Sequence, residues 1–445
     1  LSNIPQAGGL DFNSTSELSN DARGDIASLN LRTLGADTSL VLVNGRRMVA
    51  HPQTQTFGGV PIQFVNMNAI PTYGLGRIEI LRDGASALYG SDAISGVLNA
   101  VIRDDYEGLN ARVRYGLAEG TDQHDLNLRV YGGKYFNDDR TNISFSAQYY
   151  DREGLDASEL DFTAEADHQF DPRLSPDSPF FGSTSFRNDS SFSPYGEFRV
   201  GNADSSADGI DGERVRQNGD SLTSSAGLFH LQPEGFFPNS SQLGLPFGNG
   251  LELDDGSFTS STTTTGNGLD LLVGDEAYRT RPLYDNQNVF RKIIPDTQRI
   301  NLAMNATHEL NDSLEVYGDF IFYNSQSEKF FGPSVLSTSN NFVIPASYYW
   351  NPFGAELLPD GSVNPNRLAD IDAPAEGLDI AVRRYRFNEL GPRTIDVSQT
   401  QWRTLGGVRG VYKNWDWDSA FGYSRSSAED VGLLVSRSAL YTELS

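Results

Sequence analysis

The chain contains no cysteine among its 445 residues. Without thiols, neither disulfides nor a thiolate-bound metal can contribute to its fold or chemistry. Histidine is scarce as well, with five scattered residues and no pair at the spacing that places two ligands on one helix face. No Ser-His-Asp or Cys-His set can be assembled. We therefore expect no metal, no cofactor, no catalytic residues and no enzyme.

Long apolar runs are also missing. The hydrophobic fraction is 38% and the mean hydropathy is −0.42, and no run approaches the roughly 18 residues that a spanning helix requires. This excludes a helical membrane protein. The absence of long apolar runs does not exclude a transmembrane β-barrel, because its strands need only about ten residues each and only alternate side chains meet lipid. The 19 Tyr, 26 Phe and four Trp suit the aromatic girdles of such a barrel.

Positive charge is in short supply. The chain has 34 Lys and Arg against 59 Asp and Glu, for a formal net charge of −25. A surface of this sign repels a polyanion, so we expect no nucleic acid among the partners. An acidic exterior is compatible with an anionic lipid surface bridged by divalent cations.

The most informative stretch covers residues 76–103, GRIEILRDGASALYGSDAISGVLNAVIR. Ile78 and Ile80 share one face of a short strand while Arg77 and Glu79 share the other, which is the pattern of a half-buried strand. A Gly- and Ser-rich bend with room for one helical turn follows. A near-continuous apolar run then predicts a second strand, buried on both sides. The glycine spacing fits neither a Walker loop nor a dinucleotide fingerprint.

This ordered string resembles the last part of the plug domain of TonB-dependent outer-membrane receptors. Residues 31–35 (LRTLG) and 40–47 (LVLVNGRR) form a second similar piece, in which four apolar residues enter an Asn-Gly dipeptide, a strong hairpin signal. The resemblance covers residues 1–103 by motif and the remainder by pattern only.

In this family, the loop that follows the hairpin points outward from the plug apex and touches substrate. The corresponding segment 51–63 is polar and contains a Gly-Gly pair. The alternative for the segment is a solvated loop with no ligand role. The resemblance implies that the substrate-binding residues at the apex are His51, Gln53, Gln55, Phe57 and Tyr89.

Beyond residue 109 the chain changes to long strands of alternating character. Apolar and polar residues alternate in segments 111–117, 126–131, 143–150, 300–306, 314–322 and 415–423. A soluble sandwich alternates too, so the connections must decide. They are tight turns at 136–140, 311–313 and 413–414, separated by long links at 154–295 and 332–398. This contrast is typical of a barrel with one rim toward the periplasm and the other toward the medium, whereas a compact soluble domain rarely tolerates such loops.

The long links carry acidic and aromatic residues. Tyr348, Tyr349 and Trp350 precede an Asn-Pro-Phe-Gly turn and are candidates for stacking on a sugar ring or an aromatic chelator. The alternative is that these rings pack the loops on one another. The segment from Asp204 to Glu213 has partial calcium-loop spacing, but Val215 occupies the position of the bidentate Glu, which leaves calcium binding open.

We therefore expect a mainly β protein, with a small mixed α/β plug domain over residues 1–105 and antiparallel transmembrane β-barrel strands over residues 106–445. The sequence shows about seven long strands, and a barrel of roughly eight is filled by its own side chains. Family members have about 22 strands, a size at which a plugged lumen is possible. We expect the chain to be a fragment, without signal peptide, TonB box or the remaining strands.

The resemblance implies TonB-dependent active import of a scarce substrate across the Gram-negative outer membrane. The implied partners are TonB with its inner-membrane energising complex and a small-molecule substrate, either a ferric siderophore or an oligosaccharide. A passive porin and a surface glycan-binding adhesin remain the alternatives. Candidates for polar contacts between plug and barrel are Arg77, Glu79, Arg82 and Arg103, which ordinary strand-face polarity inside the plug also explains.

Overall fold

The computed structural model describes residue 14 and residues 23–57, 59–217, 220–223, 225–232, 251–252, 258–259, 271–274 and 285–444. The chain forms two compact units, which we describe separately. The plug-wall unit comprises Leu1–Leu160, Arg291–Phe330 and Thr394–Leu433. The insert unit comprises Asp161–Phe290, Phe331–Arg393 and Leu434–Ser445.

The plug is built on a four-stranded sheet in the order β2-β1-β6-β5. Its strands are β1 (Ser39–Val43), β2 (Arg46–Arg47), β5 (Leu75–Leu81) and β6 (Gly96–Ile102). Strand β1 runs parallel to β6, and β5 runs antiparallel to it. One helical turn, α1 (Ser86–Tyr89), lies between β5 and β6. The mixed α/β plug expected from the sequence is thereby confirmed.

The Asn-Gly dipeptide makes the β1–β2 turn. Asn44 and Gly45 both have positive φ, 50° and 73°, as a two-residue hairpin turn of this kind requires. The Asn44 side chain also accepts the backbone N–H of Ile102 at 2.8 Å, and the Asn99 side chain accepts the N–H of Gly45 at 2.8 Å. Together with the backbone hydrogen bond from Asn44 N–H to the carbonyl of Ala100 at 3.0 Å, these contacts tie the turn to the neighbouring strand β6.

Short elements complete the plug. A second hairpin pairs β3 with β4, and 3-10 turns occupy the connections. These elements are β3 (Gln55–Phe57), β4 (Val60–Ile62), η1 (Ala36–Thr38), η2 (Met67–Ala69), η3 (Thr72–Gly74) and η4 (Ser91–Ala93).

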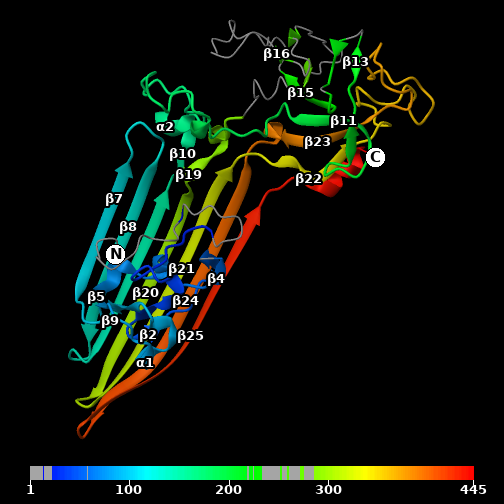
Figure 1. The fold of residues 1–445 in the computed structure, drawn as a ribbon. Helices are drawn as coiled ribbons and strands as arrows, with labels where there is room; N and C mark the ends of the chain where they lie inside the picture. The colour runs from blue at the N-terminus through cyan, green and yellow to red at the C-terminus, as the bar shows by residue number, and fades with distance from the viewer. Residues whose placement is uncertain are drawn as a thin grey trace. The chain divides into compact units, whose positions relative to one another are not determined.

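A seven-stranded antiparallel sheet, here called the wall, follows the plug in the order β25-β24-β21-β20-β9-β8-β7 (Figure 1). Each wall strand pairs with the wall strand that follows it along the chain. The bounds are β7 (Gly108–Leu117), β8 (His124–Phe136), β9 (Thr141–Arg152), β20 (Asp296–Asn311), β21 (Leu314–Phe331), β24 (Arg393–Tyr412) and β25 (Trp415–Gly432). The alternating segments and the tight turns read from the sequence are confirmed.

The two faces of the wall differ as the alternation predicts. On one face large apolar side chains are exposed, for example Val113 at 70% and Leu117 at 75%. On the other face neutral polar side chains are buried, including Ser144, Asn301 and Gln401. We call this second side the plug-facing side, because the plug packs against it.

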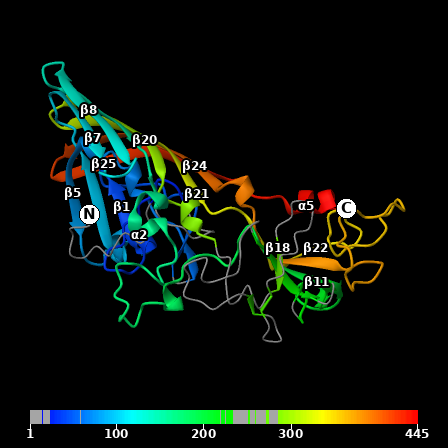
Figure 2. The same cartoon turned by 90° about the horizontal axis from the view of Figure 1, so that it is seen from above.

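The plug and the wall share one apolar cluster. Plug residues Leu31, Val43 and Leu98 are buried together with Ala303 of β20 and Ile321 of β21. Figure 2 shows β1 and β5 of the plug beside wall strands β7, β8 and β20. The plug is therefore seated on the wall by hydrophobic burial as well as by polar contacts.

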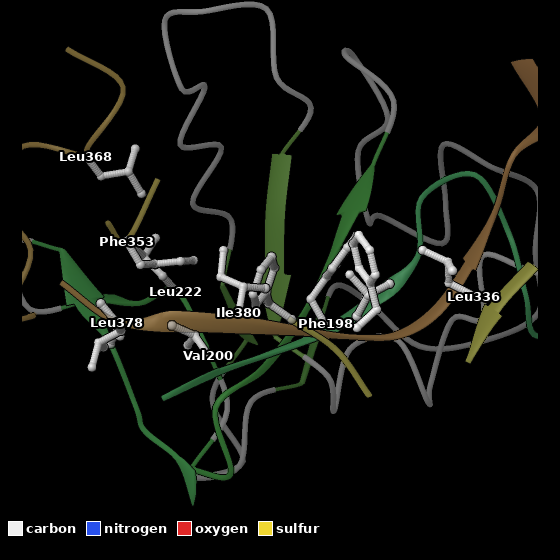
Figure 3. Close-up of a cluster of buried hydrophobic side chains, with 12 residues drawn as sticks. Phe198, Val200, Leu222, Leu336, Phe353, Leu368, Leu378 and Ile380 are labelled. Atoms are coloured by element: carbon white, nitrogen blue, oxygen red, sulfur yellow. The ribbon is translucent and has the colours of Figure 1, made fainter. Parts of the chain in front are cut away.

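The insert unit has a hydrophobic core of its own. Strands β11 (Glu197–Ala203), β15 (Leu228–Gln232), β18 (Leu271–Gly274), β22 (Val335–Ile344) and β23 (Asp379–Arg386) form one sheet, which β12 (Ile210–Gly212) joins through β11. Figure 3 shows Phe198, Val200 and Ile380 meeting at its centre. The segments 154–295 and 332–398, read from the sequence as long loops, therefore contain paired strands, because their scattered apolar residues supply a second core.

The remaining elements are short. They are α2 (Asp161–Ala164), α5 (Arg437–Leu444), η5 (Ala157–Glu159), η6 (Thr184–Phe186), η7 (Gln287–Phe290), η8 (Asn388–Leu390), β10 (Leu155–Asp156), β13 (Arg216–Gln217), β14 (Asp220–Ser221), β16 (Leu251–Glu252), β17 (Phe258–Thr259) and β19 (Lys292–Ile294). In the part of the chain that the structure describes, no helix is long and apolar enough to cross a membrane.

Candidate functional site: the seam between plug and wall

A buried ion pair joins the first described segment of the plug to the wall. Asp25, 3% exposed, accepts hydrogen bonds from the guanidinium of Arg299 on β20 through two nitrogens. The hydroxyl of Tyr323 on β21 donates to the same carboxylate at 2.8 Å. The preceding Gly24 has φ of 85°, and a Cβ there would meet Val397 of β24 at 2.8 Å. A glycine is therefore required for the chain to bring Asp25 this close to the wall.

Asn66 forms a second buried connection. Its amide nitrogen donates to the carbonyl of Asp25 at 2.8 Å and to Oε1 of Gln399 on β24 at 3.1 Å. Its amide oxygen accepts the backbone N–H groups of Ala27 and Asn68 at 3.1 and 3.0 Å. Both N–H donors and both lone pairs of this amide are therefore used, which fixes its orientation.

Two further contacts lie nearer the tight-turn end of the wall. Arg403 of β24 donates to the carbonyl of Val43 at 3.2 Å and lies 3.6 Å from Asp319 of β21. Arg46, at the plug hairpin, donates to Asp418 of β25 at 2.8 Å. The seam thus carries plug–wall ion pairs at two levels along the strands, Asp25–Arg299 and Arg46–Asp418, and both must break before the plug can move away from the wall.

The structure buries two of the residues that the sequence assigned to the plug apex. His51 and Gln55 are 0% exposed. The His51 ring stacks on Phe64 at 5.8 Å between centroids, and its Nδ1 lies 3.2 Å from the donating backbone N–H of Gln53. Burial lowers the pKa of His51, so the ring is held neutral. Phe57 ends strand β3, which pairs with β4.

Tyr89 lies at the end of α1 and is 40% exposed. Its carbonyl accepts a hydrogen bond from Arg47, whose guanidinium also binds Asp92. Of the apex candidates, Tyr89 is therefore reachable in this conformation, whereas His51 and Gln55 are not. Their role in substrate binding stays a prediction.

Of the four residues predicted to join plug and barrel, one lies against the wall in the structure. Arg77 donates to Glu79 at 2.7 Å, within the plug, and Arg82 is exposed. Arg103 lies against the wall: its carbonyl accepts from the Ser144 hydroxyl at 3.3 Å, and its guanidinium lies 6.0 Å from the centre of the Tyr131 ring. A role of the other three at the barrel stays a prediction.

The aromatic candidates of the second link lie in the insert unit, just after β22. Tyr349 and Trp350 are 43% and 54% exposed, and their rings make an edge-on pair at 4.8 Å; Tyr348 is partly buried. The following Asn351 is buried and donates to the carbonyls of Pro345 and Leu378 at 3.1 and 2.9 Å. An anchored turn therefore presents the two exposed rings.

Asp208, inside the partial calcium-loop pattern, is occupied by protein contacts. It is 4% exposed and lies 3.2 Å from Arg199 and 3.4 Å from Arg383. The Ser206 hydroxyl donates to it at 2.6 Å. Within the described residues, no group of three or more acidic or histidine side chains could hold a metal ion.

Sequence reasoning missed the residues that join plug and wall, namely Asp25, Asn66, Arg299, Tyr323 and Arg403. A usable signal exists in the strands: Arg299 and Arg403 are charged residues on faces whose other members are mostly neutral, a pattern that indicates a specific partner. Their partners on the plug carry no comparable signal, because Asp25 and Asn66 lie in segments that read as polar loop.

Comparison with known families gives an identity to the plug. Residues 5–97 match the family model described as the TonB-dependent Receptor Plug Domain. This match identifies residues 5–97 as a plug domain of the TonB-dependent receptor type.

Curated relatives match about a quarter of this chain. The iron-regulated outer membrane virulence protein of Vibrio cholerae is 31% identical over 126 residues, covering 24% of this chain and 19% of the relative. The vitamin B12 transporter BtuB of Vibrio cholerae is 34% identical over 109 residues, covering 24% and 16%. The ferric enterobactin receptor of Pseudomonas aeruginosa is 28% identical over 140 residues, covering 27% and 18%. The matches thus span less than a fifth of each relative's length.

Solved structures also align with this chain, at low sequence identity and low TM-score. The ferric preacinetobactin receptor BauA of Acinetobacter baumannii aligns with 94% of this chain and 43% of its own at 10% identity and a TM-score of 0.31. The ferric enterobactin receptor PfeA of Pseudomonas aeruginosa, in its R480A form, aligns with 97% and 53% at 11% identity and a TM-score of 0.32.

Proposed function

We propose that the protein imports a scarce small molecule across the Gram-negative outer membrane, with energy delivered through TonB and its inner-membrane energising complex. The observation that carries the proposal is the plug seated on one face of the strand wall by a shared apolar cluster and the Asp25–Arg299 pair. A plug held in this way obstructs passage along the wall. It has to be displaced before a substrate can pass.

The same proposal assigns the parts of the chain. Residues 1–105 are the plug domain, and residues 106–445 are the N-terminal part of the barrel, with the segments 154–295 and 332–398 toward the medium. The apolar face of the wall then meets the lipid and lipopolysaccharide of the membrane. Residues that the plug buries, such as His51 and Gln55, become reachable for substrate only after the plug rearranges.

For the substrate, we favour a ferric siderophore. The support is that relatives such as the ferric enterobactin receptor of Pseudomonas aeruginosa, which matches 27% of this chain, are siderophore receptors. An oligosaccharide is the second candidate, and the exposed Tyr349–Trp350 pair favours it, because edge-on aromatic pairs offer apolar faces for sugar rings.

The test is uptake in cells that carry the full-length protein. Accumulation of a labelled ferric siderophore should stop when the proton gradient is collapsed or TonB is deleted, while binding at the cell surface persists. Uptake that continues without the gradient indicates a passive porin. Binding without any accumulation in energised cells indicates an adhesin. Either result would replace the proposal.

The two substrates are separated by binding to the purified, detergent-solubilised protein. A panel of ferric siderophores and oligosaccharides is titrated while tryptophan fluorescence is recorded. A saturable siderophore signal that weakens when Tyr89 is changed supports iron acquisition. Saturable sugar binding that is lost in Trp350→Ala supports glycan import instead.

A further inference from the structure

Two arginines lie directly opposite each other on the wall. Arg112 of β7 is the register partner of Arg129 of β8. Both point to the plug-facing side, since the flanking Ala111 and Val113 are exposed on the other face. Plug residue Tyr73 marks the same side: its hydroxyl donates to Asn110 of β7, and its ring lies 5.8 Å from the Arg129 guanidinium.

Neither guanidinium has an acidic partner within ion-pair distance in the part of the chain that the structure describes. Other arginines on this face differ. Arg299 binds Asp25, Arg409 binds Glu315 at 2.7 Å, and Arg114, two residues beyond Arg112 on the same strand, binds Asp125 at 2.8 Å. In a chain with 59 acidic and 34 basic residues, a pair of cations without a carboxylate is therefore unexpected.

The pair is also oriented. Nε of Arg129 donates to Asn127 at 2.8 Å, and the plug's Tyr73 covers one face of the guanidinium. These contacts leave the two terminal nitrogens of Arg129 without a hydrogen bond among the described residues. Arg112 is exposed beside it. The free donors of the two side chains therefore belong to one accessible patch.

Like charges directly across two strands destabilise a sheet. Because the sequence keeps such a pair on the plug-facing side in spite of this local cost, the pair indicates a functional role there. Two adjacent guanidinium groups offer forked donors that match the oxygens of carboxylate or phosphate groups.

We infer that Arg112 and Arg129 form an anion-binding subsite on the plug-facing wall, for a small molecule that carries several carboxylate or phosphate groups. This inference rests on the proposed function, since it makes the imported substrate an anion. It places one subsite at mid-height of β7 and β8, between the two ends of the strands.

The test uses the full-length protein in detergent and citrate as the ligand, titrated by calorimetry at constant ionic strength. We expect saturable citrate binding, and no binding of the uncharged trimethyl citrate. In the double variant R112Q/R129Q the dissociation constant should rise at least tenfold. The matched control is Arg114→Gln, which removes one positive charge from the same strand face but from an existing ion pair, and should change the constant less than twofold.

The melting temperature provides a second measurement. If the two arginines had a purely structural role, a substitution would not raise the melting temperature and weaken citrate binding at the same time. Because Arg112→Gln removes a like-charge contact, it should raise the melting temperature of the ligand-free protein while weakening citrate binding. Absence of saturable citrate binding, equal weakening by Arg114→Gln, or a fall in melting temperature in Arg112→Gln would each overturn the subsite. None of these measurements involves transport, so they separate the subsite from the proposed import: TonB-dependent uptake with unchanged citrate affinity in R112Q/R129Q rejects the subsite alone.

Discussion

The interior of the insert unit and the seam between plug and wall are both buried, but they are built from different residues. The insert core is apolar, with Phe198, Val200 and Phe353 packed together. The seam combines a small apolar cluster with buried ion pairs and amides, among them Asp25, Asn66 and Gln399. Opening an apolar core at any point exposes apolar surface to water, and this exposure costs free energy. Buried ion pairs add little net stability but impose a specific geometry.

This difference suits two different tasks. The insert core keeps one packed state. The proposed import requires the seam to separate, and its polar groups would then regain hydrogen bonds to water. The plug-facing side of the wall also carries neutral amides and hydroxyls, such as Ser144, Asn301 and Gln401, which would be compatible with water if the plug were displaced.

We expect the largest effect from a substitution in the insert core. Phe353 is 0% exposed and packs edge-on against Phe229 at 5.4 Å. Phe353→Ala should destabilise the insert unit by about 4 kcal/mol, from lost burial and the cavity left behind. Hydrogen exchange should show loss of protection in β11 and β23 with the plug sheet unaffected. Val363→Ala, at a 75% exposed site in the same unit, is the control and should change protection little; equal loss in both variants would contradict the assignment of the core.

The next effect tests whether the seam depends on geometry. Arg299→Gln leaves the Asp25 carboxylate buried without its cation and should destabilise the plug-wall unit by about 3 kcal/mol. Replacing both partners, in Asp25→Leu with Arg299→Met, should restore stability to within about 1 kcal/mol of the original, because the desolvated charges are removed together. Chemical denaturation of the full-length protein measures both. If the double variant is as unstable as the single one, the pair is a major source of cohesion and the contrast with the insert core fails.

The sequence was sufficient for the elements whose signals are local. The strand-turn-strand of residues 76–103, the Asn44-Gly45 hairpin and the alternating wall strands were all predicted, because each is specified by periodicity or turn chemistry within a few residues. The folded insert was not, since its core gathers residues as far apart as Phe198 and Ile380. The seam was not either: Asp25 and Arg299 are separated by 274 residues, and pairing over such a distance leaves no local pattern.

A smaller effect uses pH, to which the two regions should respond with opposite signs. Burial lowers the pKa of His51, so below its ordinary value of about 6.5 the unfolded plug takes up a proton that the folded plug does not. The contribution of His51 to the unfolding free energy of the plug-wall unit is therefore fully present above that pH, and it falls as the pH drops further. In the insert unit, burial raises the pKa of Asp189 to about 6, with Asp167 adding to the shift and Arg187 opposing it. There the folded state takes up the proton first, so stability rises as the pH falls from about 7 to 5.

Hydrogen exchange at pH 7 and pH 5, read separately for peptides of each unit, measures the two responses. His51→Gln should flatten the response of the plug, and Asp189→Asn should flatten that of the insert. Slopes of the same sign in both units, or no change in either variant, would contradict the assignment.

The smallest effect on stability should come from the exposed rings. Trp350→Ala removes a side chain that is 54% exposed and whose supporting turn is held by Asn351 rather than by the indole. We expect a change in unfolding free energy within about 0.5 kcal/mol. Affinity for an oligosaccharide, if that is the substrate, should fall at least tenfold, because the lost face is the one that stacks on sugar. Leu357→Ala, 56% exposed in the same unit, is the matched control, with neither stability nor affinity changed. If Trp350→Ala instead unfolds the insert, the ring is part of its core, and the separation between a fixed core and a ligand-facing surface does not hold there.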